Sequence, residues 1–302
     1  MEPSGTYDKP GGEGNCMMSG VTIPDSAGGP HFITAPDGVR LAVYEWGNPG
    51  GAELLLIHGF AQCHLCFTPQ INSNLVQDFR VIAFDQRGHG ASEQPSDPMA
   101  YQTPDVWAND IAAVIAAKQL RRPVLVGWSM GGRVIRQYLM RFGDAELAGI
   151  NFVSSLVIED PRWRATAGSL GRTPGPQPLA CQLQEAITFL DNCFAIKPDE
   201  QTFRLALAYN MMVPKYVRAA IGNWSTDPHA TIVAMRKLRV PVLVTHGRQD
   251  TIVLSQAAEM TAEAIPGAQL SWYDQCGHSP FQEDAPRFNR ELAAFAIATT
   301  GL

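Results

Sequence analysis

One five-residue stretch constrains the fold of this chain more than any other. Gly127-Trp-Ser-Met-Gly131 has the form G-x-S-x-G and lies between an apolar run at 124–126 and a stretch with apolar residues at helical spacing, 134–139. A buried strand that turns directly into a helix explains both patterns. Glycines are needed on either side of Ser129 because side chains there would collide with the strand and the helix.

This turn would hold the Ser129 hydroxyl clear of the backbone at the start of the helix. The unpaired N–H groups of a helix N-terminus, and the positive end of its dipole, stabilise negative charge on a bound oxygen. A plain tight turn is the alternative, because five-residue patterns recur by chance. The apolar strand before the motif and the helical spacing after it favour the strand–turn–helix.

The rest of the chain alternates between apolar runs and helical patterns. Continuous apolar runs suit strands that are covered on both faces. Buried strands are predicted at 53–57, 80–84, 150–153 and 240–245, with a last strand at 269–273, and helical patterns occur at 65–76, 104–119, 255–264 and 286–298. Thr103 and Pro104 are a typical helix start. With an antiparallel hairpin predicted at 32–46, this order predicts an α/β fold with a mostly parallel sheet.

The alternation is interrupted at both the start and the middle of the chain. Residues 1–30 are rich in Gly, Pro and Ser and are predicted to be a disordered tail. Residues 157–232 contain no clear apolar strand and are predicted to be a helical insertion, or cap, that folds over the sheet edge. The core domain then consists of residues 31–156 and 233–302.

Composition excludes several classes of partner. The chain has 302 residues, 45% of them hydrophobic, and a net charge of −6. This charge gives no reason to expect nucleic acid or an anionic membrane as a partner. No apolar run approaches the ~20 residues of a membrane helix, and the first residues do not resemble a signal peptide. A cytoplasmic protein is therefore expected, and a homo-oligomer remains open.

The six cysteines are expected to be mostly reduced thiols in that compartment. Cys63-His-Leu-Cys66 resembles half of a zinc or redox site. No second cysteine or histidine pair complements it, so we expect neither a metal nor another cofactor.

Reactive side chains follow several of the predicted strands. Ser129, Asp250 and His278 each come at or just after a strand end, and the carboxyl ends of parallel strands meet at one edge of a sheet. Serine needs a neutral, oriented base, and a carboxylate on the other ring nitrogen of a histidine provides that orientation. The order Ser, Asp, His is one of the known orders of a catalytic triad.

The same motifs resemble those of the α/β-hydrolases over residues 32–300. The motifs are His58-Gly59, Asp85-Gln-Arg-Gly-His-Gly-Ala-Ser92, Gly127-Trp-Ser-Met-Gly131, His246-Gly-Arg-Gln-Asp250 and Gly277-His278. The chain is most similar to small serine esterases and cofactor-free haloperoxidases or perhydrolases. The resemblance implies Ser129 as nucleophile, Asp250 as acid and His278 as base, with an oxyanion hole formed by the N–H groups of Phe60 and Met130.

Departures from the family pattern narrow the expected chemistry. Related epoxide hydrolases and dehalogenases use an aspartate nucleophile, whereas this chain has Ser129, which favours acyl transfer from esters. Ala61 stands where haloperoxidase-like members often have proline, which argues against perhydrolysis as the main activity. Trp128 resembles the residue before the serine in some lactonases.

Other polar residues have structural interpretations. His58 and His89 are expected to hold their loops together, and Asp85 is expected to form an ion pair or support its loop. Asp274 lies too close to His278 in sequence to orient it. Glu159 and Asp160 are the alternative acid position.

The predicted function is hydrolysis of a small, largely apolar carboxylic ester through a Ser129 acyl-enzyme. The alternatives are a lactonase, an amidase, a carbon–carbon bond hydrolase, or a ligand receptor on a hydrolase scaffold. Most large side chains of the insertion should form its own core, and some should line an apolar substrate pocket. The substrate-binding candidates are Phe60, Trp128, Met130, Trp163, Phe189, Met211 and Trp224.

Overall fold

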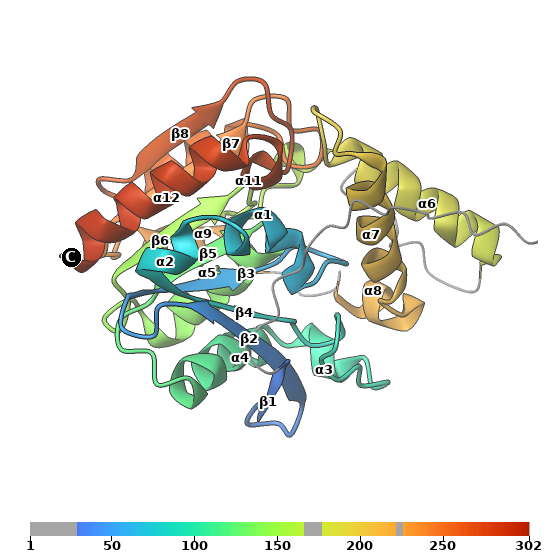
Figure 1. Ribbon diagram of the computed structural model, residues 1–302, viewed down its shortest axis with the longest axis horizontal. Helices are drawn as coiled ribbons and strands as arrows, with labels where there is room; N and C mark the ends of the chain where they lie inside the picture. Colours follow the sequence, from blue (N-terminus) through green and yellow to red (C-terminus); the bar gives the residue numbers. More distant parts are fainter. Residues whose placement is uncertain (1–28, 166–176, 222–225, 302) are drawn as a thin grey trace, which may run out of the picture.

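The computed structural model describes residues 29–165, 177–221 and 226–301. The predicted tail, residues 1–30, therefore lies almost wholly outside the described residues, and Trp224 lies outside them too. Within them, one eight-stranded sheet has the order β1-β2-β4-β3-β5-β6-β7-β8 (Figure 1). The strands are β1 (His31–Thr34), β2 (Arg40–Gly47), β3 (Ala52–Ile57), β4 (Phe79–Phe84), β5 (Val124–Trp128), β6 (Gly149–Val153), β7 (Val242–Gly247) and β8 (Gln269–Tyr273).

The sheet is antiparallel at one edge and parallel elsewhere. β2 pairs antiparallel with both β1 and β4. All other neighbouring pairs, from β4 and β3 through to β7 and β8, are parallel. Every residue of β5 and β6 is buried, as expected for strands covered on both faces. The predicted fold class is confirmed.

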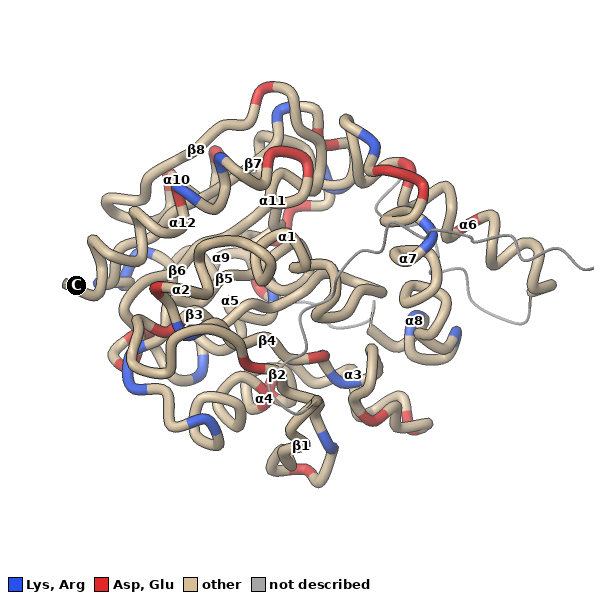
Figure 2. The backbone as a smooth tube through the Cα atoms, viewed as in Figure 1, with Lys and Arg blue, Asp and Glu red and all other residues tan. Residues whose placement is uncertain are grey.

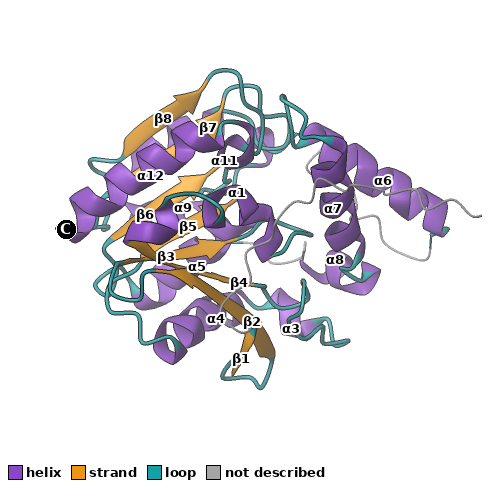
Figure 3. Cartoon of the chain, in the orientation of Figure 1, coloured by secondary structure: helices purple, strands orange, loops and turns teal. Residues whose placement is uncertain are grey.

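Helices cover both faces of this sheet (Figure 3). On one face, Gly149 of β6 lies close to Phe295 of α12 (Ala285–Thr300). Three residues along β6, Phe152 lies close to Gly132 of α5 (Met130–Phe142). Side chains alternate between the faces of a strand, so α12 and α5 lie on opposite faces. The core between these layers is continuous and apolar.

Helices fill most of the described chain between β6 and β7. These are the 3-10 helix η2 (Pro161–Trp163), α6 (Leu179–Asn192), α7 (Glu200–Met211), α8 (Lys215–Ile221) and α9 (Pro228–Met235). In Figure 1, α6, α7 and α8 lie together on one side of the sheet, with α3 (Met99–Gln102) near α8. Arg164 pairs with Val253 in an isolated antiparallel bridge, which ties the start of this segment to the loop after β7.

The structure differs from the predicted helix at 65–76. Three short pieces replace it, η1 (His64–Phe67), α1 (Thr68–Ile71) and α2 (Leu75–Asp78). Between α1 and α2, the Ser73 hydroxyl donates to Gln70 O at 2.7 Å and accepts from Leu75 N at 3.2 Å. Such local side-chain bonds to the backbone compete with the helical ladder.

The predicted helix start at Thr103 is correct in position, but the Thr103 side chain does not cap the helix. α4 (Pro104–Ala117) begins where predicted, yet the Thr103 hydroxyl donates to Met99 O at 3.4 Å rather than capping α4. The helix α10 (Gln256–Ala264) and the strand β8 agree closely with their predicted ranges. Two short helices, α3 and α11 (Pro280–Glu283), were not predicted. Among the described helices, we find none with the length and apolar character that crossing a bilayer requires.

Candidate active site

Ser129 lies on a strained turn between β5 and α5. Its backbone has φ 55° and ψ −113°, a region that residues other than glycine rarely adopt, and its N–H donates to Val153 O at 2.8 Å. A side chain at Gly131 would fall on the carbonyl oxygen of Ile57, and one at Gly127 would lie 2.5 Å from Ile135. The steric reason given for both glycines is therefore correct.

His278 and Asp250 form a buried hydrogen-bonded pair. The distance from His278 Nδ1 to Asp250 Oδ2 is 2.8 Å. The other carboxylate oxygen of Asp250 accepts the backbone N–H groups of Ile252 and Val253, at 2.8 and 2.9 Å. These bonds fix the carboxylate beside one ring nitrogen, so the other nitrogen of His278 is left for a proton acceptor role.

A second histidine, which the sequence did not identify as functional, supports Asp250. His246 Nε2 lies 3.2 Å from Asp250 Oδ2 and 2.9 Å from Val253 O. Burial alone would raise the pKa of Asp250, but His278 and His246 outweigh it and hold that pKa well below its usual range. Asp250 therefore stays ionised. The spacing of four residues from His246 to Asp250 was visible, but nothing in the sequence marked it as a contact.

Trp128 connects the Ser129 turn to His278. Its indole Nε1 donates to the His278 carbonyl oxygen at 2.8 Å, and the two ring centroids are 5.6 Å apart. A small cavity is lined by Ser129 and also by Ile252 and Val253, the residues that bind Asp250. The structure thus brings the segments that carry the three candidate catalytic residues to one end of the sheet.

The turn after β3 lies directly against Ser129. A side chain added at Gly59 would lie 3.3 Å from Ser129 Cβ, so Phe60 follows at close range. Ala61 has φ 55°, and its N–H donates to His89 Nε2 at 3.1 Å, which fixes this turn. Met130 is the first residue of α5, where backbone N–H groups have no acceptor within the helix. Phe60 and Met130 therefore both lie near Ser129.

The residues given structural interpretations occupy structural positions. His58 Nε2 accepts from Gln86 N at 2.9 Å, and burial lowers the pKa of His58 to about 4. Asp85 accepts from His64 N and from Ala91 N, at 2.8 and 2.9 Å.

The acidic residues considered as alternatives to Asp250 form ion pairs with arginines. Glu159 accepts from Arg133 at 2.5 Å, and Asp160 pairs with Arg162. Asp274 pairs with Arg248 on the surface at 3.1 Å.

The sequence model of the alpha/beta hydrolase fold family matches residues 53–285, a stretch that includes the Ser129 turn, Asp250 and His278. The chain belongs to this family. This match agrees with the α/β-hydrolase fold that the sheet order shows.

Solved structures and sequence relatives point to one branch of the α/β-hydrolases. A Burkholderia cenocepacia crystal structure, of a proposed aryl esterase, is 33% identical with a TM-score of 0.85, and covers 90% of this hydrolase and 100% of that chain. The esterase RhEst1 from Rhodococcus sp. ECU1013 is 29% identical with a TM-score of 0.81, and the match covers 90% of this chain and 99% of that chain. A non-heme chloroperoxidase of Streptomyces lividans is 26% identical over 87% of this chain and 98% of its own. The α/β-hydrolase therefore lies in the esterase and haloperoxidase-like branch, as predicted.

The predicted substrate-binding residues of this hydrolase have different surroundings. Phe189 of α6 is buried, and its ring meets the Phe60 ring edge-on with centroids 6.1 Å apart, so it reaches the turn beside Ser129. Trp163 and Met211 are half-buried, and Trp163 O accepts from Leu254 N. Trp224 lies outside the described residues.

Glu283 is a second residue that the sequence did not identify as functional. Its carboxylate accepts the N–H groups of Gly277 and Ser279, on either side of His278, at 3.0 and 3.1 Å. The same carboxylate accepts from Ala195 and Ile196, both at 2.8 Å, in the segment after α6. Glu283 therefore joins the His278 loop to the helices between β6 and β7. A Ser-Pro helix start followed by Glu within one turn was the available signal.

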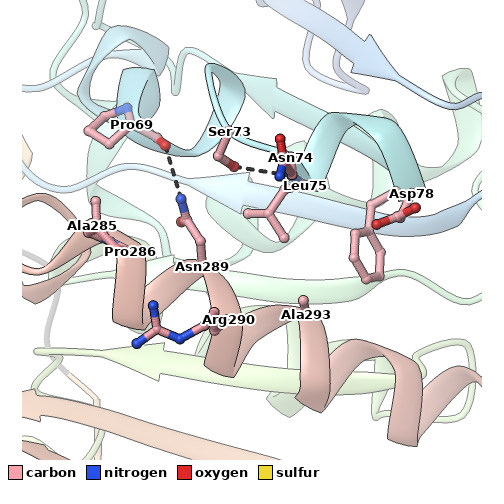
Figure 4. A pocket seen from close by; sticks show the side chains of 11 residues that line it. Pro69, Ser73, Asn74, Leu75, Asp78, Ala285, Pro286, Asn289, Arg290 and Ala293 are labelled. Atoms are coloured by element: carbon pink, nitrogen blue, oxygen red, sulfur yellow. Dashed lines mark hydrogen bonds between the residues drawn. The ribbon is translucent and has the colours of Figure 1, made fainter.

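Larger cavities of the hydrolase lie away from these residues. One of about 490 Å³ lies between α1, α2 and α12, where Asn289 Nδ2 donates to Pro69 O at 3.1 Å (Figure 4). Another of about 540 Å³ lies between β8 and α12. Neither lining includes Ser129, Asp250 or His278, so we assign neither cavity to the chemistry.

The cysteine motif of the hydrolase lies beside the buried Asp85. Cys63 and Cys66 are buried free thiols. Cys63, His64 and Asp85 offer three potential ligand atoms within 4.8 Å of one another. However, Asp85 already accepts from the backbone and from His64 Nδ1 at 2.9 Å, and burial raises the pKa of the Cys63 thiol well above its usual range. The donor set therefore fits a loop network better than a metal site, because a thiol ligand must be deprotonated.

Proposed function

We propose that the protein is a carboxylic-ester hydrolase that acts through a Ser129 acyl-enzyme. The observation that carries the proposal is the 2.8 Å bond from His278 Nδ1 to Asp250, on a loop that Trp128 holds next to the serine turn. The esterase relatives support ester hydrolysis in general. The proposed substrate is a small ester with a largely apolar acyl group, because Leu156, Ile252 and Val253 line the cavity at Ser129.

The proposed mechanism has two steps that use the same residues. In the first, His278 removes the Ser129 proton, the oxygen attacks the ester carbonyl, and His278 returns the proton to the leaving alcohol. In the second, His278 removes a proton from water, the hydroxide attacks the acyl-enzyme, and Ser129 is regained with the acid as product. Asp250 remains ionised and stabilises the imidazolium in both steps.

The backbone N–H groups of Phe60 and Met130 would bind the developing oxyanion. The dipole of α5 adds positive potential at the same place, since Ser129 is its N-cap. One donor of this kind is worth about 10²–10³ in rate. We further propose that α6, α7 and α8 form a cap over this site, with Phe189 as the described contact from the cap to Phe60.

The direct test is replacement of the nucleophile. Ser129→Ala should lower kcat for p-nitrophenyl acetate by about 10⁴-fold or more, and a labelled fluorophosphonate should react with the native protein but not with the variant. The matched control is Ser96→Ala, an exposed serine in the loop before α3. Full turnover by Ser129→Ala would disprove the proposal. A panel of esters, lactones, amides and carbon–carbon cleavage substrates would then compare kcat/KM across reaction classes.

A further inference from the structure

Asp250 uses its two carboxylate oxygens differently. Oδ1 accepts the backbone N–H groups of Ile252 and Val253, at 2.8 and 2.9 Å. Oδ2 has an imidazole nitrogen on either side, His278 Nδ1 at 2.8 Å and His246 Nε2 at 3.2 Å. The side chain of Asp250 is fully buried, so bulk water does not reach Oδ2. His246 therefore occupies the part of Oδ2 that His278 leaves open.

The surroundings of His246 determine which of its ring nitrogens carries a proton. Nε2 lies next to two acceptors, Asp250 Oδ2 and, at 2.9 Å, Val253 O. Nδ1 is buried and has no hydrogen-bond partner in the part of the chain that the structure describes. A proton on Nδ1 would be an unpaired buried donor, whereas a proton on Nε2 has two acceptors. His246 is therefore a donor to Asp250.

A second donor changes the carboxylate that His278 meets. A hydrogen bond to an ionised carboxylate stabilises the anion and lowers its affinity for protons. Such a carboxylate also attracts a positive imidazolium less strongly, so His278 gives up its proton more readily. The same bond restricts rotation of the Asp250 side chain and thereby keeps Oδ2 directed at His278 Nδ1. Orientation and base strength of His278 thus both depend on His246.

We propose that His246 is a positioning residue of the triad, which donates to Asp250 Oδ2 and through this oxygen controls the orientation and base strength of His278. This inference rests on the proposed ester hydrolysis, in which His278 is the base. His246 does not touch the substrate and exchanges no proton in the reaction. Its contribution is to the state of the carboxylate before and during each proton transfer.

Other ionisable groups near the triad do not bind His246 or Asp250 Oδ2 within the described residues. Cys193, just after α6, remains a neutral thiol, because burial and the charge of Asp250 raise its pKa well above the usual range. Arg248 packs over the Trp272 ring, which meets the His246 ring edge to face with centroids 6.1 Å apart. The ionisable residues of the elements packed against β7 are Tyr273 of β8, Glu259 and Glu263 of α10 and Glu283 of α11. All of these groups are unchanged in the variants below.

The test replaces His246 with a ring that has no donor and with an amide that has one. His246→Phe keeps a ring in the buried space but removes the Nε2 proton. His246→Gln keeps a donor, because its amide nitrogen is as many bonds from the backbone as Nε2. Turnover of p-nitrophenyl acetate is measured as kcat and as kcat/KM against pH.

His246→Phe should lower kcat by about 10–100-fold, because His278 is then oriented less strictly. The acid side of its kcat/KM profile should move to higher pH by about 0.5–1 unit, because a carboxylate that has lost a donor stabilises protonated His278 more strongly. His246→Gln should remain close to the native enzyme in both respects. His229→Phe, at an exposed position on α9, is the control and should change neither.

A merely structural role for His246 predicts a different result. Loss of kcat in His246→Phe with an unmoved pH profile would overturn the proposal, and so would an equal loss in His246→Gln.

NMR of the native protein, labelled in its histidine rings, tests the proton position without ester turnover. The signal of His246, identified by its loss in His246→Gln, should show the proton on Nε2. A proton on Nδ1 with Nε2 bare would overturn the proposal, even if His246→Phe fails to fold and even if esters are hydrolysed. Conversely, a proton on Nε2 without ester turnover or fluorophosphonate labelling by the native protein would reject the serine hydrolase and keep the bond from His246 to Asp250.

Discussion

Packing and hydrogen bonds of neighbouring residues, and not the Ser129 side chain, hold the Ser129 backbone in its strained conformation. Its φ of 55° persists because Gly131 lets α5 approach the end of β3, and because Ser155 Oγ donates to Ser129 O at 2.7 Å. Strained φ values of this kind cost of order 1–3 kcal/mol, which the surrounding packing must supply. The turn is therefore a property of several segments together.

Gly131→Ala tests this dependence. The new methyl group would meet the carbonyl oxygen of Ile57, which cannot move without disturbing β3. We expect the free energy of unfolding to fall by about 3 kcal/mol or more, with loss of ester turnover, measured by denaturant unfolding and kcat. Gly50→Ala, whose methyl group would meet only Asn48 at 3.6 Å, is the control. Similar stability of the two variants would contradict the account.

Buried histidines should make the protein sensitive to mild acid. Burial lowers the pKa of His58 to about 4 and that of His89 to about 3, both below the 6.5 of an unfolded chain. Between these values the unfolded state binds more protons, so the free energy of unfolding falls as pH drops from about 6.5. For His58 alone the loss is on the order of 3 kcal/mol at pH 4.

The measurement is denaturant unfolding from pH 7 to pH 4.5. His89→Gln should make the free energy of unfolding depend less steeply on pH, because one of the two buried histidines no longer titrates. The exposed His229→Gln should leave the slope as it is. A native protein of constant stability over this range would refute the prediction. Protonated His89 also cannot accept from Ala61 N, so the turn at Phe60 should loosen over the same range.

The helices and strands that the sequence predicted well are those with strong periodicity. The central strands β5 and β6 are buried along their whole length, and α10, α12 and β8 agree with their predicted ranges within a few residues. The region after β3 was mispredicted because Ser73 and Thr68 bind nearby carbonyl groups and divide it into short turns. Such local competition leaves the apolar pattern unchanged, so periodicity alone does not reveal it.

The candidate site was predictable where a motif marks it. Ser129, Asp250, His278 and Phe60 follow strands and were identified from residue type and order. His246 and Glu283 were not, because each acts through a contact that depends on tertiary packing: His246 lies beside the Asp250 carboxylate, and Glu283 binds a loop far along the chain. Sequence patterns therefore identified the candidate catalytic residues, whereas the residues that hold them in place depend on tertiary packing.

Glu283 in α11 connects two such elements, and its removal should affect both. Glu283→Ala leaves the N–H groups of Ala195, Ile196, Gly277 and Ser279 without their acceptor. We expect a loss of at least about 2 kcal/mol in unfolding free energy and a lower kcat, because His278 lies within the released loop.

Glu283→Gln keeps one accepting oxygen and should recover part of both losses. Glu259→Ala, on the exposed side of α10, is the control. If Glu283→Ala lowers stability but leaves kcat at the native value, the carboxylate holds the helices and does not position His278.

At the scale of the whole molecule, the sheet and the helices α6, α7 and α8 beside it are expected to contribute differently to the proposed activity. In Figure 2, acidic and basic residues occur on the sheet domain and also on α6, α7 and α8, so neither part is of one charge sign. In the proposed mechanism the reacting residues lie at the ends of sheet strands, and Phe189 of α6 contacts Phe60 in the turn beside Ser129. Substrate size should therefore depend on the helices and reactivity on the sheet.

Phe189→Leu separates these two tasks. Removing ring area beside Phe60 should enlarge the acyl region, so the preferred acyl chain of p-nitrophenyl esters should lengthen by about one or two carbons, with kcat on the best ester changed little. The comparison is Leu183→Ala, on the exposed side of the same helix. An unchanged chain-length profile would mean that Phe189 packs against Phe60 without bounding the substrate.

The turn between β5 and α5 also bears on which side chain position 129 can accommodate. Glycines and backbone contacts hold its geometry, and the hydroxyl contributes none of the restraints described above. A thiol or a carboxylate at this position would take the same half-buried place at the start of α5. Evolution could therefore exchange the attacking atom in this architecture without rebuilding the scaffold that presents it.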